Sequence, residues 1–469
     1  MKKIFNWVLA ATLVCSPAAF TSCTSGSEDN PGQEQAKKNR KEFVQHTRAT
    51  LKTLAENLNF RSWDEANMFN TYLNEYVLNN PEFNRSVIIT FIQQAYQNVK
   101  PVEAGSELSQ MGYKMYGTVD LTNFNYRFTM NDDMTGFDVE PADDFEVLLS
   151  GWSPLTQKIE KDIYKIVMKS SGTILTRVIS SSRMDGMAVV LRLSSDFQFA
   201  VSNKVAGTWI DNYTGTLHYS RAEGATDASK GYDASATINS RIPAAGGKPA
   251  DDTQLYFAIS SDRVNGHATS KFSYVQNDRK LIELSMKESG NDIVNLSNID
   301  LKNFTQAASI FDVIAAILGT RSIDEASLTL LDDLTTNFSI SNIAQAIMVQ
   351  HKSKEARRNY ADQQTIDQYT QQLNQLMSAK ITCKGLGQEI PMRLVTEKFG
   401  VDYVTMPAFN FSDENGYVSL VDLLDAESMK YAINIVDHSA EPLQQSVIVA
   451  RQLLQFLQSV YSAPFSIEE

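Results

Sequence analysis

The chain has 469 residues and a formal net charge of −13, with 42 basic residues against 55 acidic ones. Its length allows two to four domains at about 150 residues each, so burying a large core is not a difficulty. A surplus of negative charge repels phosphate groups and anionic headgroups, which argues against a nucleic-acid partner.

The first residues have the form of a secretory leader. Lys2 and Lys3 precede an apolar run from Ile4 to Phe20, which closes on Phe20-Thr21-Ser22-Cys23. A short positive segment, an apolar core and small residues before the end of the run are typical of a cleaved signal peptide. The apolar run is shorter than the ~20 residues that a membrane-spanning helix needs, so we expect a leader and not a transmembrane anchor.

The tetrapeptide that ends at Cys23 resembles the lipobox of bacterial lipoproteins, particularly the Ser-Cys ending common in the Bacteroidota. The resemblance implies cleavage before Cys23 and attachment of acyl chains such as palmitate to that residue, and two or more chains hold a protein stably on a membrane. We therefore predict a signal peptide over residues 1–22 and a lipidated, flexible tether over 23–41. The expected location is the outer membrane, facing either the periplasm or the cell surface.

Beyond the tether, the periodicity of apolar residues changes three times along the chain. It predicts a helical segment over residues 42–104, an antiparallel β domain over 105–300, a second helical segment over 301–379, and over 380–469 strands that rejoin the sheet followed by a C-terminal helix. The predicted fold class is α+β, a predominantly antiparallel meander flanked by helices from both ends of the chain. The strands with the clearest alternation are 124–130, 174–179, 187–193, 215–219, 234–242, 254–260, 269–275 and 280–286.

Within this scheme, Trp152 to Met168 is expected to interrupt the sheet with helical turns. Helices are expected at Phe304 to Leu318, Ile340 to His351, Asp362 to Met377 and Leu443 to Tyr461.

Cys383 is the one cysteine left for the folded body, since Cys15 leaves with the leader and Cys23 is used for lipid. No intramolecular disulfide is therefore expected. Cys383 follows an alternating segment that predicts a strand, and in that setting we interpret it as a small core residue and not as a nucleophile.

The chain lacks the common signatures of zinc enzymes and serine hydrolases. Its five histidines have no partner at metal-ligand spacing along the sequence, so we expect no catalytic metal and no cofactor. We predict that the protein is not an enzyme.

Two acidic segments are weak candidates for a hard cation such as calcium, which prefers several oxygen ligands. One contains Asp132, Asp133 and Asp138; the other contains Asp413 and Asn415 just before Gly416. The alternatives are a solvated loop for the first and a plain Asn-Gly turn for the second.

Trp209, Tyr213 and Tyr219 lie close together in the β segment and form a candidate aromatic surface for a sugar. The alternative is that these rings belong to the core, as aromatic residues on one face of a sheet often do. The sequence favours an envelope lipoprotein that binds a glycan or an envelope protein without catalysis. Two alternatives stay open: a carrier of a lipid or other apolar ligand in a half-barrel cavity, and a hydrolase whose site the sequence does not reveal.

Overall fold

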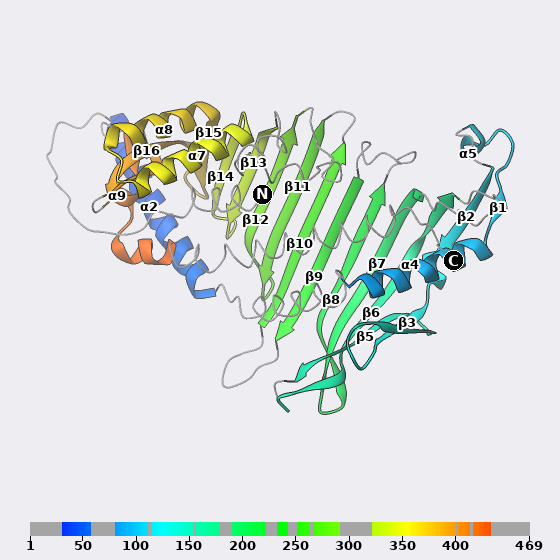
Figure 1. Ribbon diagram of the computed structural model, residues 1–469. Coiled ribbons are helices and arrows are strands. Elements are labelled where there is room, and N and C mark those ends of the chain that lie inside the picture. Colours follow the sequence, from blue (N-terminus) through cyan, green and yellow to red (C-terminus); the bar gives the residue numbers. More distant parts are fainter. Residues whose placement is uncertain are drawn as a thin grey trace. The chain divides into compact units, whose positions relative to one another are not determined.

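The computed structural model describes residues 31–57, 80–110, 114–153, 156–177, 190–221, 232–242, 251–262, 266–290, 321–399, 402–412 and 416–432. The chain divides into two compact units. Unit 1 comprises the described residues of Met1–Phe60 and Asn265–Gln444, and unit 2 those of Arg61–Val264 and Gln445–Glu469. The fold class is α+β with a large, mostly antiparallel sheet, as the sequence predicted (Figure 1).

In unit 2, the sheet is built from long neighbouring strands that pair in chain order. β6 pairs with β7, β7 with β8, β8 with β9 and β9 with β10, all antiparallel. The strands of this unit are β1 (Lys100–Pro101), β2 (Met115–Asp120), β3 (Tyr126–Met130), β4 (Phe137–Pro141), β5 (Phe145–Ser153), β6 (Lys158–Arg177), β7 (Val190–Val205), β8 (Thr208–Arg221), β9 (Tyr232–Ile242) and β10 (Asp251–Asp262).

The other side of β6 carries the shorter strands of unit 2. β2 and β5 both pair with β6 in antiparallel fashion, and β1 pairs with β2. β3 pairs antiparallel with β4 and parallel with β5, which is a parallel exception in an otherwise antiparallel arrangement.

Helix α4 (Pro81–Gln97) covers part of one face of this sheet. Its N-terminus is well capped, because the Asn80 side chain accepts hydrogen bonds from the backbone N–H groups of Glu82 and Phe83, and Pro81 occupies the first helical turn. Two short helices, α5 (Glu107–Gln110) and the 3₁₀ turn η2 (Leu121–Asn123), complete the described helices of the unit.

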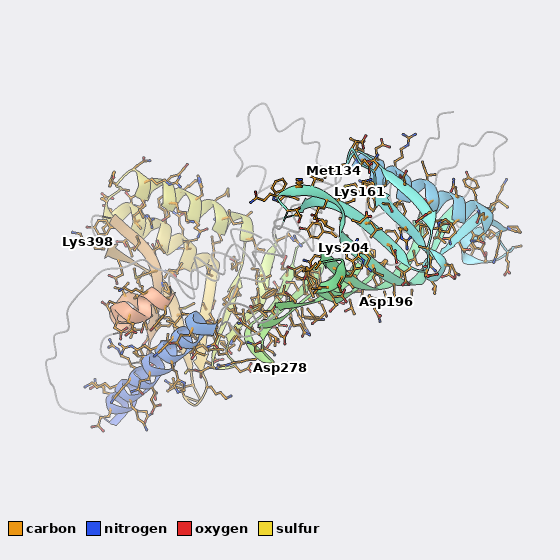
Figure 2. All side chains as sticks on the ribbon, turned by 90° about the horizontal axis from the view of Figure 1, so that it is seen from below. Met134, Lys161, Asp196, Lys204, Asp278 and Lys398 are labelled. Atoms are coloured by element: carbon orange, nitrogen blue, oxygen red, sulfur yellow. The ribbon has the colours of Figure 1, made fainter. Side chains whose placement is uncertain are left out.

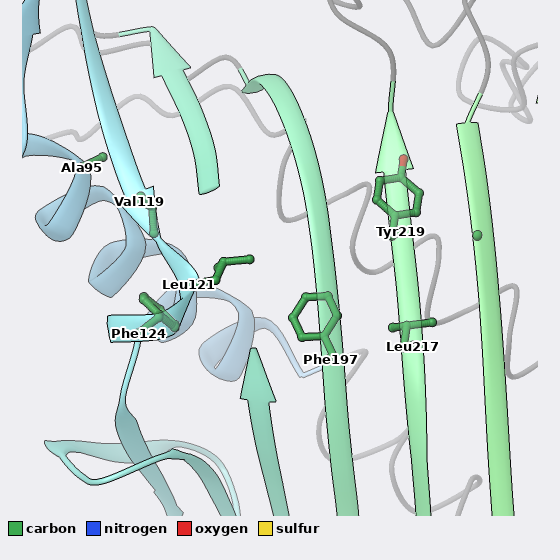
Figure 3. Close-up of a cluster of buried hydrophobic side chains, with 8 residues drawn as sticks. Ala95, Val119, Leu121, Phe124, Phe197, Leu217 and Tyr219 are labelled. Carbon is green, nitrogen blue, oxygen red and sulfur yellow. The ribbon is translucent and has the colours of Figure 1, made fainter. Parts of the chain in front are cut away.

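The apolar face under α4 forms two packed clusters. Figure 3 shows the first, in which Phe197, Leu217 and Tyr219 of the sheet lie with the residues contributed by α4, β2 and η2. In the second, Phe83 and Val87 of α4 pack with Phe128 and its neighbours on β3 and β5. The Phe83 ring meets the Phe128 ring edge-on at 5.5 Å between centroids.

In unit 1, the strands pair in order from β11 to β18, and the helices α7 and α8 lie between β14 and β15 along the chain. The elements are α2 (Pro31–Asn57), β11 (His267–Gln276), β12 (Arg279–Ser289), β13 (Ser322–Leu330), β14 (Leu334–Ile340), α7 (Ile343–Arg358), α8 (Gln363–Leu376), β15 (Met377–Cys383), β16 (Glu389–Phe399), β17 (Asp402–Asn410), β18 (Tyr417–Ser419) and α9 (Leu420–Leu423). Strands β15 to β17 therefore rejoin β11 and β12 through β13 and β14, as predicted for the strands of the segment 380–469.

Helix α2 packs on the other elements of unit 1, although more than two hundred residues separate it from them in the sequence. The Phe43 ring lies 5.2 Å from the Phe409 ring and 5.4 Å from the Phe411 ring. Arg48 forms an ion pair of 3.2 Å with Asp425. The N-terminal helix is thus held by the C-terminal part of the chain.

Three predicted boundaries are wrong. The tether was expected to reach residue 41, but α2 begins at Pro31, because Gln, Glu, Lys and Ala between 33 and 41 are strong helix formers and Ala36 and Asn39 are buried. The segment Trp152 to Met168 is the β5–β6 hairpin and not a set of helical turns. Residues 322–340 form the β13–β14 hairpin inside the segment that was predicted to be helical.

Several predictions lie outside the described residues. These are the leader with Cys23, the helices at 304–318 and 443–461, and the cation candidates Asp413 and Asn415.

Candidate functional site

Two hairpin turns meet at one end of the unit 2 sheet. The β5–β6 turn precedes Lys158, the first residue of β6, and the β7–β8 turn follows Val205, the last residue of β7. Since β6 and β7 are antiparallel partners, both turns lie at the same end of the sheet (Figure 1). We call this surface the hairpin end and define it by Trp152, Ile159, Lys165, Lys204, Val205, Trp209 and Ile210.

The β7–β8 turn is tight and consists of Ala206 and Gly207. Both residues have positive φ, 50° and 83°, which matches the twist of a two-residue hairpin. Val205 pairs with Thr208 and Lys204 with Trp209 directly beside the turn. The turn therefore fixes where the Trp209 indole stands.

Trp209 is half-buried and two lysines lie over its ring. The Lys204 ammonium is 5.4 Å from the ring centroid and the Lys165 ammonium, from neighbouring β6, is 4.9 Å away. Each contact of this kind stabilises the arrangement by ~0.5–1 kcal/mol at an exposed site. The indole is thereby fixed between its own hairpin and β6, and Figure 2 labels Lys204 at this place.

Four large hydrophobic side chains are exposed at the hairpin end, and two of them, Val205 and Ile210, lie on the face of the β7–β8 hairpin opposite Trp209. Trp152 and Ile159 stand opposite each other on β5 and β6 and are 57% and 63% exposed. Val205 and Ile210, beside the β7–β8 turn, are 36% and 42% exposed. Four of the eight large hydrophobic residues that are exposed in the described part of the chain thus gather at the hairpin end. Contiguous exposed apolar patches are typical of interaction sites, whereas single exposed hydrophobic residues need no explanation.

Trp209, Tyr213 and Tyr219 do not form the single aromatic surface that the sequence suggested. Val201 pairs with Tyr213 while Ser202 pairs with Asp211, so β8 contains an extra residue at Asn212. This bulge reverses the alternation, and Trp209 therefore points to the opposite face from Tyr213 and Tyr219.

Tyr219 is only 2% exposed and belongs to the core cluster in Figure 3, and Tyr213 is half-buried on the same face. The alternative interpretation, in which these rings are core residues, holds for Tyr219.

The acidic segment at 132–138 is stabilised by contacts of its own. Asp132 forms an ion pair with Lys161, and Asp133 accepts hydrogen bonds from the backbone N–H and the hydroxyl of Thr135. The Thr135 hydroxyl and N–H lower the pKa of the Asp133 carboxyl. Asp138 is exposed on β4, opposite Thr129. These carboxylates do not converge on a cation site.

Folding brings together a different set of possible metal ligands, in unit 1. His46 of α2, Asp333 of the β13–β14 turn and Cys383 at the end of β15 place one ligand atom each within 4.8 Å of one another. His46 Nδ1 lies 3.1 Å from Asp333 Oδ1, and the Thr50 hydroxyl donates to Asp333 Oδ2 at 2.9 Å. Among the described residues this is the one group of three or more histidine, cysteine or acidic side chains with that spacing.

The Cys383 thiol is buried, at 4% exposure, as the sequence predicted for a core cysteine. Burial, together with the negative charges of Asp333 and Glu42, raises the pKa of the thiol to about 12. Without a cation beside it, the thiol therefore stays protonated at neutral pH and is a poor nucleophile.

No helix in the described ranges is long and apolar enough to cross a membrane. Comparisons with protein-family models, with curated proteins and with solved structures found no match to the chain.

Proposed function

We propose that this protein is a non-catalytic envelope lipoprotein that binds another envelope protein through the hairpin end. The observation that carries the proposal is the exposure of four large hydrophobic side chains, Trp152, Ile159, Val205 and Ile210, at the same end of the sheet as the lysine-flanked Trp209. Apolar side chains in contact with water are costly, and a partner that covers them removes that cost.

The chemistry of the surface favours a protein partner over a glycan. Three of the four exposed side chains are branched aliphatic residues, which suit the apolar core of a protein interface. A sugar needs polar groups placed around an exposed ring. The ring of Trp209 is half-buried and contacted by Lys165 and Lys204.

The side chains at the hairpin end also suit binding better than acid–base chemistry. They are indole, aliphatic and ammonium groups. Lys161, beside this surface, has a raised pKa because it bonds to the Asp132 carboxylate, so it remains a charged group and not a proton acceptor at neutral pH. The predicted lipid anchor at Cys23 supports the proposal, since anchoring concentrates a binding protein where envelope partners are found.

Photo-crosslinking in cells that make the protein natively tests the proposal. Benzoylphenylalanine replaces Trp152, Ile210 or, as the control, Tyr360, which is 78% exposed on the α7–α8 connection of unit 1. We expect the same discrete protein adduct from positions 152 and 210, and no such adduct from position 360. Absence of an adduct at 152 and 210, or an identical adduct pattern at all three positions, would refute the proposal.

A glycan array run with the wild-type protein separates the sugar alternative. Binding that is lost in Trp209→Ala without any protein adduct would favour a glycan ligand.

A further inference from the structure

Three elements of unit 1 bring His46, Asp333 and Cys383 together. Leu334 of β14 pairs with Cys383 of β15, and the Lys384 N–H donates to the Asp333 carbonyl at 2.8 Å. These contacts fix the β13–β14 turn beside the end of β15. Helix α2 then places His46 over the turn, since Phe43, three residues earlier, is anchored between Phe409 and Phe411.

The distances are close to those of a tetrahedral zinc site. Zinc binds nitrogen and oxygen at about 2.0–2.2 Å and sulfur at about 2.3 Å, so two of its ligand atoms stand about 3.3–3.7 Å apart. The 3.1 Å between His46 Nδ1 and Asp333 Oδ1 is already near that separation. The longest pair, at no more than 4.8 Å, needs to close by about 1 Å.

The surroundings favour a cation. The Asp333 carboxylate is one of the three groups and brings the negative charge that attracts a metal ion. Thr50 donates to Asp333 Oδ2 and so orients the carboxylate, whose other oxygen, Oδ1, faces His46 Nδ1 at 3.1 Å.

We propose that His46, Asp333 and Cys383 form a zinc site with three protein ligands, whose fourth position is open to water or a partner's ligand. Sulfur and imidazole ligands select zinc over magnesium and calcium, which require oxygen. Sequence spacing did not reveal this site. Its three ligands are far apart in the chain, at positions 46, 333 and 383, and only one of them is a histidine.

Cobalt titration of the purified full chain tests the site, because Co²⁺ replaces Zn²⁺ in such sites and gives visible and near-ultraviolet bands. The background carries Cys15→Ser and Cys23→Ser, so that Cys383 is the single thiol among the three cysteines of the chain. We expect one equivalent of cobalt to produce a thiolate-to-cobalt charge-transfer band, and one equivalent of zinc to abolish it. Cobalt binding without that band would overturn the proposal. This outcome can be judged from the Cys15→Ser, Cys23→Ser protein alone.

Single variants then assign the ligands. Cys383→Ser should remove the charge-transfer band, and His46→Ala should weaken cobalt binding roughly 10-fold or more. The matched control is His218→Ala. His218 Nδ1 contacts the Asp196 carboxylate at 2.6 Å in unit 2, which is a histidine–carboxylate pair in a setting without a cysteine ligand. A band that persists in Cys383→Ser, or an equal loss of affinity in His218→Ala, would contradict the assignment.

Discussion

Gly215 shows how a single position limits the unit 2 sheet. Its cross-strand partner is Phe199, whose ring lies over the glycine. A Cβ atom at position 215 would stand 2.2 Å from the Thr237 carbonyl oxygen and 2.6 Å from the Phe199 ring. Because the carbonyl belongs to the backbone of β9, a side chain at this position requires the neighbouring strand to move.

We expect Gly215→Ala to lower the free energy of unfolding by ~1–3 kcal/mol, the usual cost of overpacking. Urea denaturation measures the change. Gly136→Ala is the control, because its new methyl group would meet the end of the Asn131 side chain at 3.0 Å and not a strand backbone. Equal stability of Gly215→Ala and the wild type would show that this close approach is not present in the protein.

Cys383 makes stability depend on pH on the alkaline side. Its thiol has a pKa of about 12 in the folded chain, against about 8.5 for an exposed cysteine. Below the unfolded value both states are protonated; above it the unfolded chain ionises first, so stability falls as the pH rises from about 8.5 towards 12. With a chelator present, the wild type should lose more stability than Cys383→Ala between about pH 8 and pH 10. Parallel curves for the two proteins would contradict the raised pKa.

The proposed zinc site and the hairpin end show which residues sequence reasoning could find. It found Cys383 as a buried residue but not its neighbours His46 and Asp333. A cysteine in an alternating segment predicts burial, and Cys383 is buried. The contact between His46 and Asp333 spans 287 positions, and no local pattern reveals it. The prediction that Trp209, Tyr213 and Tyr219 form one aromatic surface was wrong because of the bulge at Asn212. A one-residue bulge leaves no clear mark in the sequence.

At the scale of elements, prediction succeeded where one face of a strand or helix is buried. Helix α8 was predicted from its apolar stripe, and Ile366 and Leu373 of that stripe are buried. Prediction failed at the β5–β6 hairpin, because Ile159, Ile163 and Ile166 are spaced as on a helix although β-branched residues favour strands. The β13–β14 hairpin was missed because its turn, Leu331 to Asp333, contains two residues with positive φ, Leu331 and Asp332, and neither is glycine.

Asn374 attaches α8 to the sheet. Its amide nitrogen donates to the Leu394 carbonyl and its amide oxygen accepts from the Leu394 N–H, both at 2.8 Å. We expect Asn374→Asp to lower the free energy of unfolding by ~1–3 kcal/mol, because the carbonyl of β16 loses its donor.

Gln371→Glu is the control for Asn374→Asp, since it makes the same amide-to-carboxylate change at an exposed position of the same helix. Thermal unfolding of both variants compares them. An equal loss of stability in the two variants would mean that the added charge on α8 destabilises the protein, and not the loss of the hydrogen bond to Leu394.

At the scale of the whole molecule, alternation and turn residues were sufficient to predict an α+β fold with an antiparallel meander. The length allowed two to four domains, but the segments that make up each unit were not predicted, because unit 1 joins the N-terminal helix to strands beyond residue 265. Such an association depends on contacts such as that of Phe43 with Phe409, which are distant in the sequence.

Anchoring belongs to this scale. We expect Cys23→Ala to move the protein from the membrane fraction to the soluble fraction, because the lipobox resemblance assigns the acyl chains to that residue. Fractionation followed by immunoblotting measures the change, with Cys15→Ala as the control for loss of a cysteine in the same leader. Retention of Cys23→Ala in the membrane would mean that another feature of the chain attaches it.

The most direct test of the proposed binding role is the dissociation constant of the crosslinked partner for purified wild-type and variant proteins. The double variant Trp152→Ser, Ile159→Ser removes the exposed cross-strand pair, and Tyr360→Ser removes an exposed aromatic residue of unit 1. We predict that the double variant binds roughly 10-fold more weakly or worse, as expected for central apolar residues of an interface, while Tyr360→Ser binds like the wild type. Wild-type affinity in the double variant, with its fold intact by circular dichroism, would contradict the account.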